Sequence, residues 1–453
     1  MAENRDALVR HPVAIAGALI ATASAAVFIV LVVAVVAGMF ENPYAGLVVF
    51  IAIPALFVIG LLLIPLGVRL EKRRLARHPG ERAEWPVVDF RVPQVRKTAL
   101  LISALTIVNL LIVAMAAYGS LHWMESPTFC GQVCHTPMQP QFTAWQHAPH
   151  ARVACVSCHI GEGPKAFVHA KLAGVRQLVH VATGSVPKPI PPGAEMPPGA
   201  QAQTCAGCHQ PDRMRGDQIR VMREYADDEA NTETVTVLQM YLDRSSPSGR
   251  AIHWHADPSV RIEYIAADAR NETIPYVKVT GANGQVKEFV AADTSEELIR
   301  TGARKTMDCM DCHNTVGHPI SPTPEAAVDR AIAMGWVNRK LPFVRREGVR
   351  LMKADYPSQD DGARAIDQGL RTFYQSNGGV VDQQAVAQTA LELQNLYRRN
   401  VFPTMKVTWG SYPNNRGHIT STGCFRCHDD SHVAKDKSTI SADCEYCHKQ
   451  IER

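Results

Sequence analysis

The sequence predicts a mainly α-helical protein: three transmembrane helices, then a larger extracytoplasmic domain with a small β insertion and a C-terminal helical module. Three observations support this fold class. Three uncharged apolar runs of more than twenty residues all lie in the first 120 of 453 residues. All twelve cysteines lie beyond them, in six short-spaced pairs. The spacing of apolar residues after the third pair is first strand-like and then helical.

The three apolar runs are each long enough to span a bilayer, which requires about 20 residues. They cover residues 13–38, 44–68 and 98–120. The first run is too long, and too closely followed by the second, for a cleaved signal peptide. Buried core helices are the alternative, which three such runs in an otherwise polar chain disfavour. We therefore expect residues 1–120 to form a membrane anchor.

The orientation of the anchor follows from its loops. Residues 69–97 carry nine basic residues against four acidic ones, whereas the short turn at 39–43 offers only Glu41. By the positive-inside rule the basic loop and the N-terminus are cytoplasmic. Everything after Ser120 then lies on the opposite side, so we expect a bacterial inner (cytoplasmic) membrane protein with its main domain on the periplasmic face.

Each of the six cysteine pairs is followed directly by a histidine. Five motifs read C-x-x-C-H and the first reads C-x-x-x-C-H, which is the attachment signature of c-type haem. The thiols form thioethers to the haem and the imidazole binds the iron. We predict six covalently bound haem c groups, numbered by motif: Cys130, Cys134 and His135; Cys155, Cys158 and His159; Cys205, Cys208 and His209; Cys309, Cys312 and His313; Cys424, Cys427 and His428; Cys444, Cys447 and His448.

Other uses of cysteine pairs fit less well. Zinc ribbons and disulfide scaffolds do not need a histidine after every pair. For Cys130 and Cys134 a plain disulfide or a single thioether stays open, because the extra residue changes the geometry. Bacteria attach haem c outside the cytoplasm, which agrees with the predicted orientation.

Charge and motifs exclude several other functions. The formal net charge is +4; the loop at 69–97 contributes +5, Glu41 contributes −1 and the N-terminal tail contributes 0. The part with the cysteine motifs is therefore formally neutral, which gives no sign of nucleic acid as a partner. No Gly-rich phosphate loop, nucleophile elbow or zinc-protease helix stands out.

Six irons also need sixth ligands. A free histidine is usually a surface residue, but this requirement makes each extracytoplasmic histidine a candidate. His418 and His432 flank the fifth motif, so we expect them to serve haems 5 and 6 in some pairing. The ten candidates are His122, His147, His150, His169, His180, His253, His255, His318, His418 and His432.

The run Phe129–Leu178, directly after an apolar span, resembles the NapC/NirT/NrfH family of membrane-anchored tetrahaem quinol dehydrogenases. The resemblance rests on His147 before the second motif and on the Gly163-Pro164-Lys165 segment after it. CMDCHNTVGH, at Cys309–His318, is similar to the family's fourth motif. The similarity covers about residues 98–324, with an insertion. The family normally has a single anchor helix, so the first two spans are additional.

The resemblance implies several ligands. It makes His147, which precedes the second motif, the ligand of a haem other than the one bound at that motif. It makes His318 a distal ligand. It places a further distal histidine at His253 or its neighbour His255. It also implies Met138 as an iron ligand of haem 1, where the alternative is a methionine that only packs on the porphyrin.

The resemblance also implies a function: a membrane-bound hexahaem cytochrome that takes electrons from quinol, such as menaquinol, at haem 1 and relays them to periplasmic acceptors. The lysine of the family's quinol pocket corresponds best to Lys171, with Lys165 as second choice, and an acidic position corresponds to Gln177. Two alternatives stay open. One is an electron-relay subunit of a larger respiratory complex without its own quinol site, and the other is a multihaem reductase of a small oxyanion.

The remaining segments complete the predicted domains. Residues 121–325 are expected to hold haems 1–4, with a β insertion at about 214–297 that alternates like strands. Residues 326–453 are expected to form a haem-free helical module followed by a segment with haems 5 and 6. That segment would extend the haem chain away from the membrane.

Overall fold

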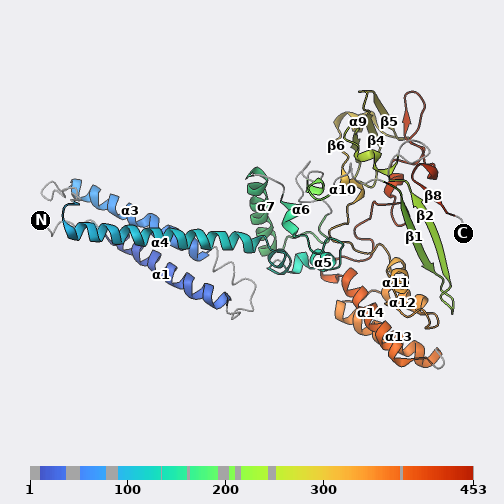
Figure 1. Ribbon diagram of the computed structural model, residues 1–453, viewed down its shortest axis with the longest axis horizontal. Coiled ribbons are helices and arrows are strands. Elements are labelled where there is room, and N and C mark those ends of the chain that lie inside the picture. Colours follow the sequence, from blue (N-terminus) through green and yellow to red (C-terminus); the bar gives the residue numbers. More distant parts are fainter. Residues whose placement is uncertain are drawn as a thin grey trace. The chain divides into compact units, whose positions relative to one another are not determined.

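The computed structural model divides the chain into two units, Met1–Val133 and Cys134–Arg453. It describes residues 11–36, 52–77, 90–133, 135–160, 164–191, 204–209, 216–242, 251–377 and 381–451. Figure 1 labels the elements of each unit along the chain. The first unit holds the predicted anchor, and the second holds five of the six cysteine motifs.

The first unit consists of helices. They are α1 (Pro12–Val36), α3 (Ile53–Arg77) and α4 (Pro93–Met124), followed by a π-helical turn η2 (Phe129–Val133). Within the described residues, two stretches are long and apolar enough to cross a membrane, Pro12–Leu31 and Ile53–Glu71. Both fall on predicted spans. Helix α4 covers the third predicted run, whose role as a span stays a prediction.

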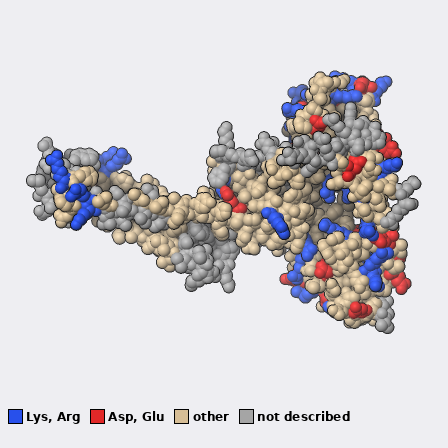
Figure 2. Space-filling model, in the orientation of Figure 1, with Lys and Arg blue, Asp and Glu red and all other residues tan. Residues whose placement is uncertain are grey.

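Helices α1 and α3 pack closely and antiparallel through small residues. A Cβ on Gly60 would lie 2.6 Å from the backbone nitrogen of Ala21, and one on Gly67 would lie 2.4 Å from that of Ala14. Only glycine permits such an approach, which is the way helices associate in membranes. The lysine and arginine side chains of this unit gather at one end of it (Figure 2), where α3 finishes with Arg74 and Arg77.

Motifs 2, 4, 5 and 6 lie in or next to short helical turns, which are α6 (Cys155–His159), α10 (Cys309–Cys312), η6 (Gly423–Arg426) and η7 (Cys444–Tyr446). Further helical elements of this unit are α5 (His135–Gln146), α7 (Pro164–Ala182), η4 (Ile252–Ala256), α9 (Glu296–Thr301) and η5 (Pro403–Met405).

Two antiparallel sheets flank the motifs. One has the order β1-β2-β8, and the other has the order β6-β3-β4-β5-β7. The strands are β1 (Gln218–Tyr225), β2 (Glu233–Met240), β3 (Arg261–Ile265), β4 (Tyr276–Thr280), β5 (Val286–Val290), β6 (Arg304–Thr306), β7 (Val433–Ala434) and β8 (His448–Gln450).

The predicted β insertion at about 214–297 therefore supplies most strands but not whole sheets. The C-terminal segment adds an edge strand to each: β8 pairs Met240 with His448, and β7 pairs Phe289 with Ala434. A hydrophobic cluster on the larger sheet also includes Cys427 of the fifth motif. The C-terminal motifs are thus built into the sheets that the insertion begins.

The helical module is present as the apolar spacing predicts. It comprises α11 (Pro324–Ala333), α12 (Val344–Lys353), α13 (Gln359–Asn377) and α14 (Gln383–Asn400). Their inward faces form one hydrophobic core, to which β1 contributes Tyr225. The tip of the β1–β2 hairpin is fixed to this module by the buried Asn231, whose amide donates to the carbonyl oxygens of Arg339 and Leu341.

Candidate haem sites

The regular cysteine motifs share one local geometry. In motifs 3, 4 and 5 the backbone N–H of the histidine donates to the carbonyl of the first cysteine, at 2.7, 2.8 and 3.0 Å. This single helical turn brings both thiols and the imidazole to one side. Aspartates start two of the turns: Asp308 forms a capping box on α10, and Asp443 accepts from the N–H of Glu445.

Every regular motif histidine faces a second histidine from a distant part of the chain. The ring centroids of each pair are separated by a similar distance. The pairs are His159 with His318 (6.4 Å), His209 with His150 (6.0 Å), His313 with His253 (6.5 Å), His428 with His255 (5.8 Å) and His448 with His418 (6.1 Å).

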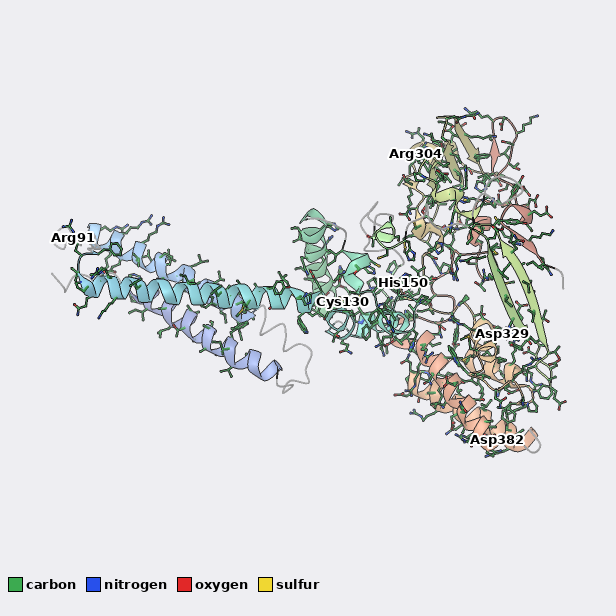
Figure 3. All side chains as sticks on the ribbon, viewed as in Figure 1. Arg91, Cys130, His150, Arg304, Asp329 and Asp382 are labelled. Carbon is green, nitrogen blue, oxygen red and sulfur yellow. The ribbon has the colours of Figure 1, made fainter. Side chains whose placement is uncertain are left out.

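This separation fits an iron held between two imidazoles. A metal–nitrogen bond of about 2 Å on each side, plus the distance from each nitrogen to its ring centre, gives roughly 6 Å between centroids. Several rings are also oriented by a backbone carbonyl on Nδ1, which leaves Nε2 for a metal. These contacts are His150 to Val316 (3.2 Å), His255 to Ile252 (2.8 Å) and His428 to Ser441 (2.9 Å). Figure 3 labels His150.

Burial keeps these imidazoles in the neutral form that binds a metal. It lowers the pKa of His318 to about 4, with a further contribution from the neighbouring His159. Burial likewise lowers the pKa values of His159, His253 and His313. A neutral ring offers a free nitrogen lone pair.

The thiols of successive motifs lie close to one another. Burial and then the neighbouring thiols of Cys309 and Cys158 raise the pKa of Cys205 to about 11. In the same way, burial and the nearby thiol of Cys424 raise the pKa values of both Cys312 and Cys447 to about 11. Motifs 2 to 6 therefore follow one another in space in their sequence order.

One short helix serves two neighbouring motifs. In η4, His253 lies beside His313 of motif 4 and His255 beside His428 of motif 5. A 3₁₀ helix has three residues per turn, so side chains two residues apart point about 120° away from each other. The His-x-His sequence can therefore present its two rings to two different sites.

A buried arginine joins motifs 4 and 5. The guanidinium of Arg426 donates to the carbonyl oxygens of Asp311 (2.7 Å), Gly423 (2.8 Å) and Asn271 (3.0 Å). The carboxylate of Asp311 in turn accepts from the hydroxyl of Tyr264. These bonds fix the distance between the two motifs and connect both to strand β3.

Among the predicted distal ligands, the structure brings His253, His318 and His418 beside motif histidines. It does not do so for His147 or His432. His147 lies near Arg399, and burial followed by that positive charge lowers its pKa. His432 is 2% exposed, with Nδ1 bonded to Asp429 (2.8 Å) and Nε2 to the carbonyl of Ile274 (2.6 Å). Both nitrogens of His432 are thus occupied by protein partners.

The rings beside the other two motif histidines belong to His150 and His255. Both are among the ten candidate histidines, but sequence reasoning assigned no haem to His150 and gave His255 only as a substitute for its neighbour. The His-x-His spacing was the available signal for His255. No comparable local signal marks His150 over His147, because the neighbour of His150 is His209, fifty-nine residues further along the chain.

The first motif is only partly within the described residues. Cys134 lies outside them, as does the side chain of His135, whereas Cys130 is half-buried in η2. A π-helical turn links residues five apart, which matches the separation of Cys130 and His135. Met138 is half-buried on α5 and Lys171 on α7, while the side chain of Lys165 lies outside the description.

The two alternative uses of the cysteine pairs differ in their outcome. The alternative of a disulfide between Cys130 and Cys134 stays open, because Cys134 lies outside the described residues. Among the residues that the structure describes, no three His, Cys, Asp or Glu side chains cluster as a cage for a bare metal ion. Paired imidazoles beside paired thiols are the arrangement that the structure repeats.

Comparison with known proteins gives two matches. Residues 92–189 match the model of the NapC/NirT cytochrome c family, N-terminal region. The chain is also 35% identical over 450 residues to the cytochrome c-type protein ImcH of Geobacter sulfurreducens, covering 97% of this chain and 88% of that protein. No solved structure matches the chain.

Proposed function

Because this chain belongs to the NapC/NirT cytochrome c family, a family of membrane-anchored c-type cytochromes in electron transport, we propose that it takes electrons from the quinol pool and passes them through six haems to a periplasmic acceptor. The observation that carries the proposal is the set of five histidine pairs with centroids 5.8–6.5 Å apart, one at each regular motif. Each haem iron, when bound, carries one electron at a time.

The chain's residues divide this work. The twelve cysteines attach the haems, and His135, His159, His209, His313, His428 and His448 are the proximal ligands. We assign the distal positions of haems 2 to 6 to His318, His150, His253, His255 and His418. Met138 stays the proposed ligand at haem 1. Five histidine-paired sites leave no open coordination position at the regular motifs, so an oxyanion reductase would have to use haem 1.

Quinol oxidation releases two electrons and two protons, so the site needs one-electron carriers and a group that handles protons. We propose that haem 1 receives the electrons singly and that Lys171 of α7 binds the quinol oxygen and takes part in proton removal. Motif 1 begins six residues after α4 ends at Met124, which supports electron uptake close to the bilayer.

The test uses the full chain in proteoliposomes. Its mass should exceed that of the polypeptide by six haems, and a menaquinol analogue alone should reduce it. Lys171→Met should slow reduction by the quinol analogue by about 10²-fold, the usual contribution of a proton-transferring group, without changing reduction by dithionite. An unchanged rate of reduction by the quinol analogue in this variant would show that Lys171 is not part of the quinol site.

One observation favours a second function. The α1–α3 pair is additional to the family's single anchor helix, and its close packing through glycine makes it a stable unit. Such a pair could instead bind another membrane subunit, which would make the chain a relay within a larger complex. Full haem content without any reduction by quinol would select this alternative.

The proposed location is the inner membrane, with the haem domain on the periplasmic face. The arginines at the end of α3 support a cytoplasmic position for that end of the anchor. A membrane-impermeant lysine reagent added to the outside of spheroplasts should label the haem domain and leave Lys72 and Lys97 of the loop at 69–97 unlabelled. The reverse pattern would overturn the orientation.

A further inference from the structure

Helix α7 exposes four large apolar side chains, while three of its alanines are partly buried. Val168, Leu172, Val175 and Val179 are 55, 60, 59 and 56% exposed. The alanines at 166, 170 and 173 are only half-exposed. A helix on the surface of a water-soluble domain normally has the opposite arrangement, with its large apolar residues toward the core.

The four exposed residues form one continuous stripe. Their spacings of four, three and four residues place them above one another on a helix with 3.6 residues per turn. The stripe runs along most of α7, from its second turn to its last. Four aliphatic side chains in register are more than the scattered exposed apolar residues that any protein carries.

The charges on α7 are all basic. Its sequence, PKAFVHAKLAGVRQLVHVA, contains no aspartate or glutamate. At 100° per residue, Lys171 lies about 70° to one side of the stripe and Arg176 about 70° to the other. Long basic side chains at the edges of an apolar stripe can extend their charges to the level of lipid headgroups while their stems stay in apolar surroundings.

We propose that α7 lies in the plane of the membrane interface, with this stripe among the acyl chains and Lys171 and Arg176 at anionic headgroups. The pattern is that of interfacial helices, which bury an apolar face about 5–10 Å deep and carry basic residues at its edges. The occupant is lipid because the chain is already anchored in the bilayer and α7 begins forty residues after α4 ends. A protein partner would more often be met by charges of both signs.

This inference goes beyond the proposed function and does not depend on it. It gives the haem-bearing unit a second contact with the membrane besides the anchor helices. It also sets the depth of Lys171, which would lie at the headgroups whether or not it binds quinol.

The experiment places the full protein in liposomes that contain a phospholipid with a photoreactive group on its acyl chain. After illumination, lipid adducts are mapped by peptide mass spectrometry. We expect adducts on the 164–182 peptide as well as on α1 and α3. The internal control is Leu391 of α14, which is 53% exposed in the haem-free module and should carry no adduct.

Two variants complete the test. Leu172→Lys should lose most adducts on the 164–182 peptide while the haem absorbance spectrum stays that of the parent protein. Arg176→Gln should lower the adduct yield in anionic liposomes and not in neutral ones. Absence of adducts on 164–182 in the parent protein, with α1 and α3 labelled, would overturn the proposal; so would equal labelling of the Leu391 peptide.

Discussion

The helical module and the haem-motif segments belong to one unit but are stabilised in different ways. In the module, Ile366, Leu370, Val386 and Leu393 are fully buried against one another. By contrast, the motif helices α6, α10 and η7 and the ligand helix η4 contain no buried residue. The module has a protein core, and the motif segments have hydrogen bonds and caps.

The difference shows what each region needs in order to fold. Burial of aliphatic side chains contributes about 25 cal/mol per Å² of apolar surface, so the module can be stable by itself. The motif segments have little such surface to bury. Their thiols and imidazoles are arranged around a cofactor, and thioether and iron–nitrogen bonds would hold segments that the polypeptide alone holds weakly.

The largest effect should follow from preventing haem attachment. Expressed without the cytochrome c maturation machinery, the chain should lose protection from protease in residues 135–320 and 410–451. A fragment containing α11 to α14 should survive, because its core needs no cofactor. Limited proteolysis with mass spectrometry of the products measures this directly.

The matched control is the same digestion of the holoprotein, in which both regions should resist. If the motif segments resist digestion equally without haem, their hydrogen bonds suffice and the contrast between the two regions disappears.

The next effect should come from single ligands. His255→Leu should convert one low-spin haem to a high-spin form, seen in the absorbance spectrum, because His255 faces His428. His432→Leu should leave all low-spin haems in place, although it removes the buried partner of Asp429 and should cost about 1–3 kcal/mol in the free energy of unfolding. If the His432 variant forms a high-spin haem and the His255 variant does not, then His432 is the ligand and His255 is the structural residue.

The same contrast explains how much the sequence could predict. The helical module was predictable because apolar residues recur with a helical period, as in EAAVDRAIAMGW, and their burial follows from that period. The attachment motifs were predictable because the chemistry fixes their spacing. Both signals are local in the sequence.

The distal ligands were less predictable because they depend on tertiary structure. His150 and His209, and likewise His255 and His428, come together only when segments far apart in the chain have packed. His432 lies four residues after a motif histidine, yet strand β7 turns it into the protein, toward the carbonyl of Ile274. Nearness in sequence favours His432, whereas the geometry supports our proposal of His255 at haem 5.

The domain boundaries show a similar limit. Strand-like alternation located the insertion at 214–297, but no local pattern indicated that residues 433–434 and 448–450 would complete its sheets. Those two edge strands are only two and three residues long, below the length at which alternation is detectable.

A smaller effect is expected in the core of the module. Leu393→Ala should lower its free energy of unfolding by about 2–5 kcal/mol, because the fully buried side chain leaves a cavity. Leu391→Ala, two residues away on the same helix and 53% exposed, should change it by less than about 0.5 kcal/mol. Urea denaturation followed by far-UV circular dichroism measures both. If the absorbance spectrum of the haems is unchanged in both variants, the module is energetically separate from the motif segments.

The smallest effect concerns the start of α14, where Asp382 (labelled in Figure 3) accepts a hydrogen bond from the N–H of Gln384 at 2.9 Å. Asp382→Ala leaves that N–H without its partner and should lower the free energy of unfolding by about 1 kcal/mol, whereas Asp382→Asn keeps an acceptor and should cost only a few tenths. Motif helix η7 has an equivalent cap at Asp443, on the N–H of Glu445. There, Asp443→Ala should change stability much less in the holoprotein, since covalent haem attachment would hold the turn. Equal losses at Asp382 and Asp443 would mean that the haem segments depend on ordinary helix energetics as much as the module does.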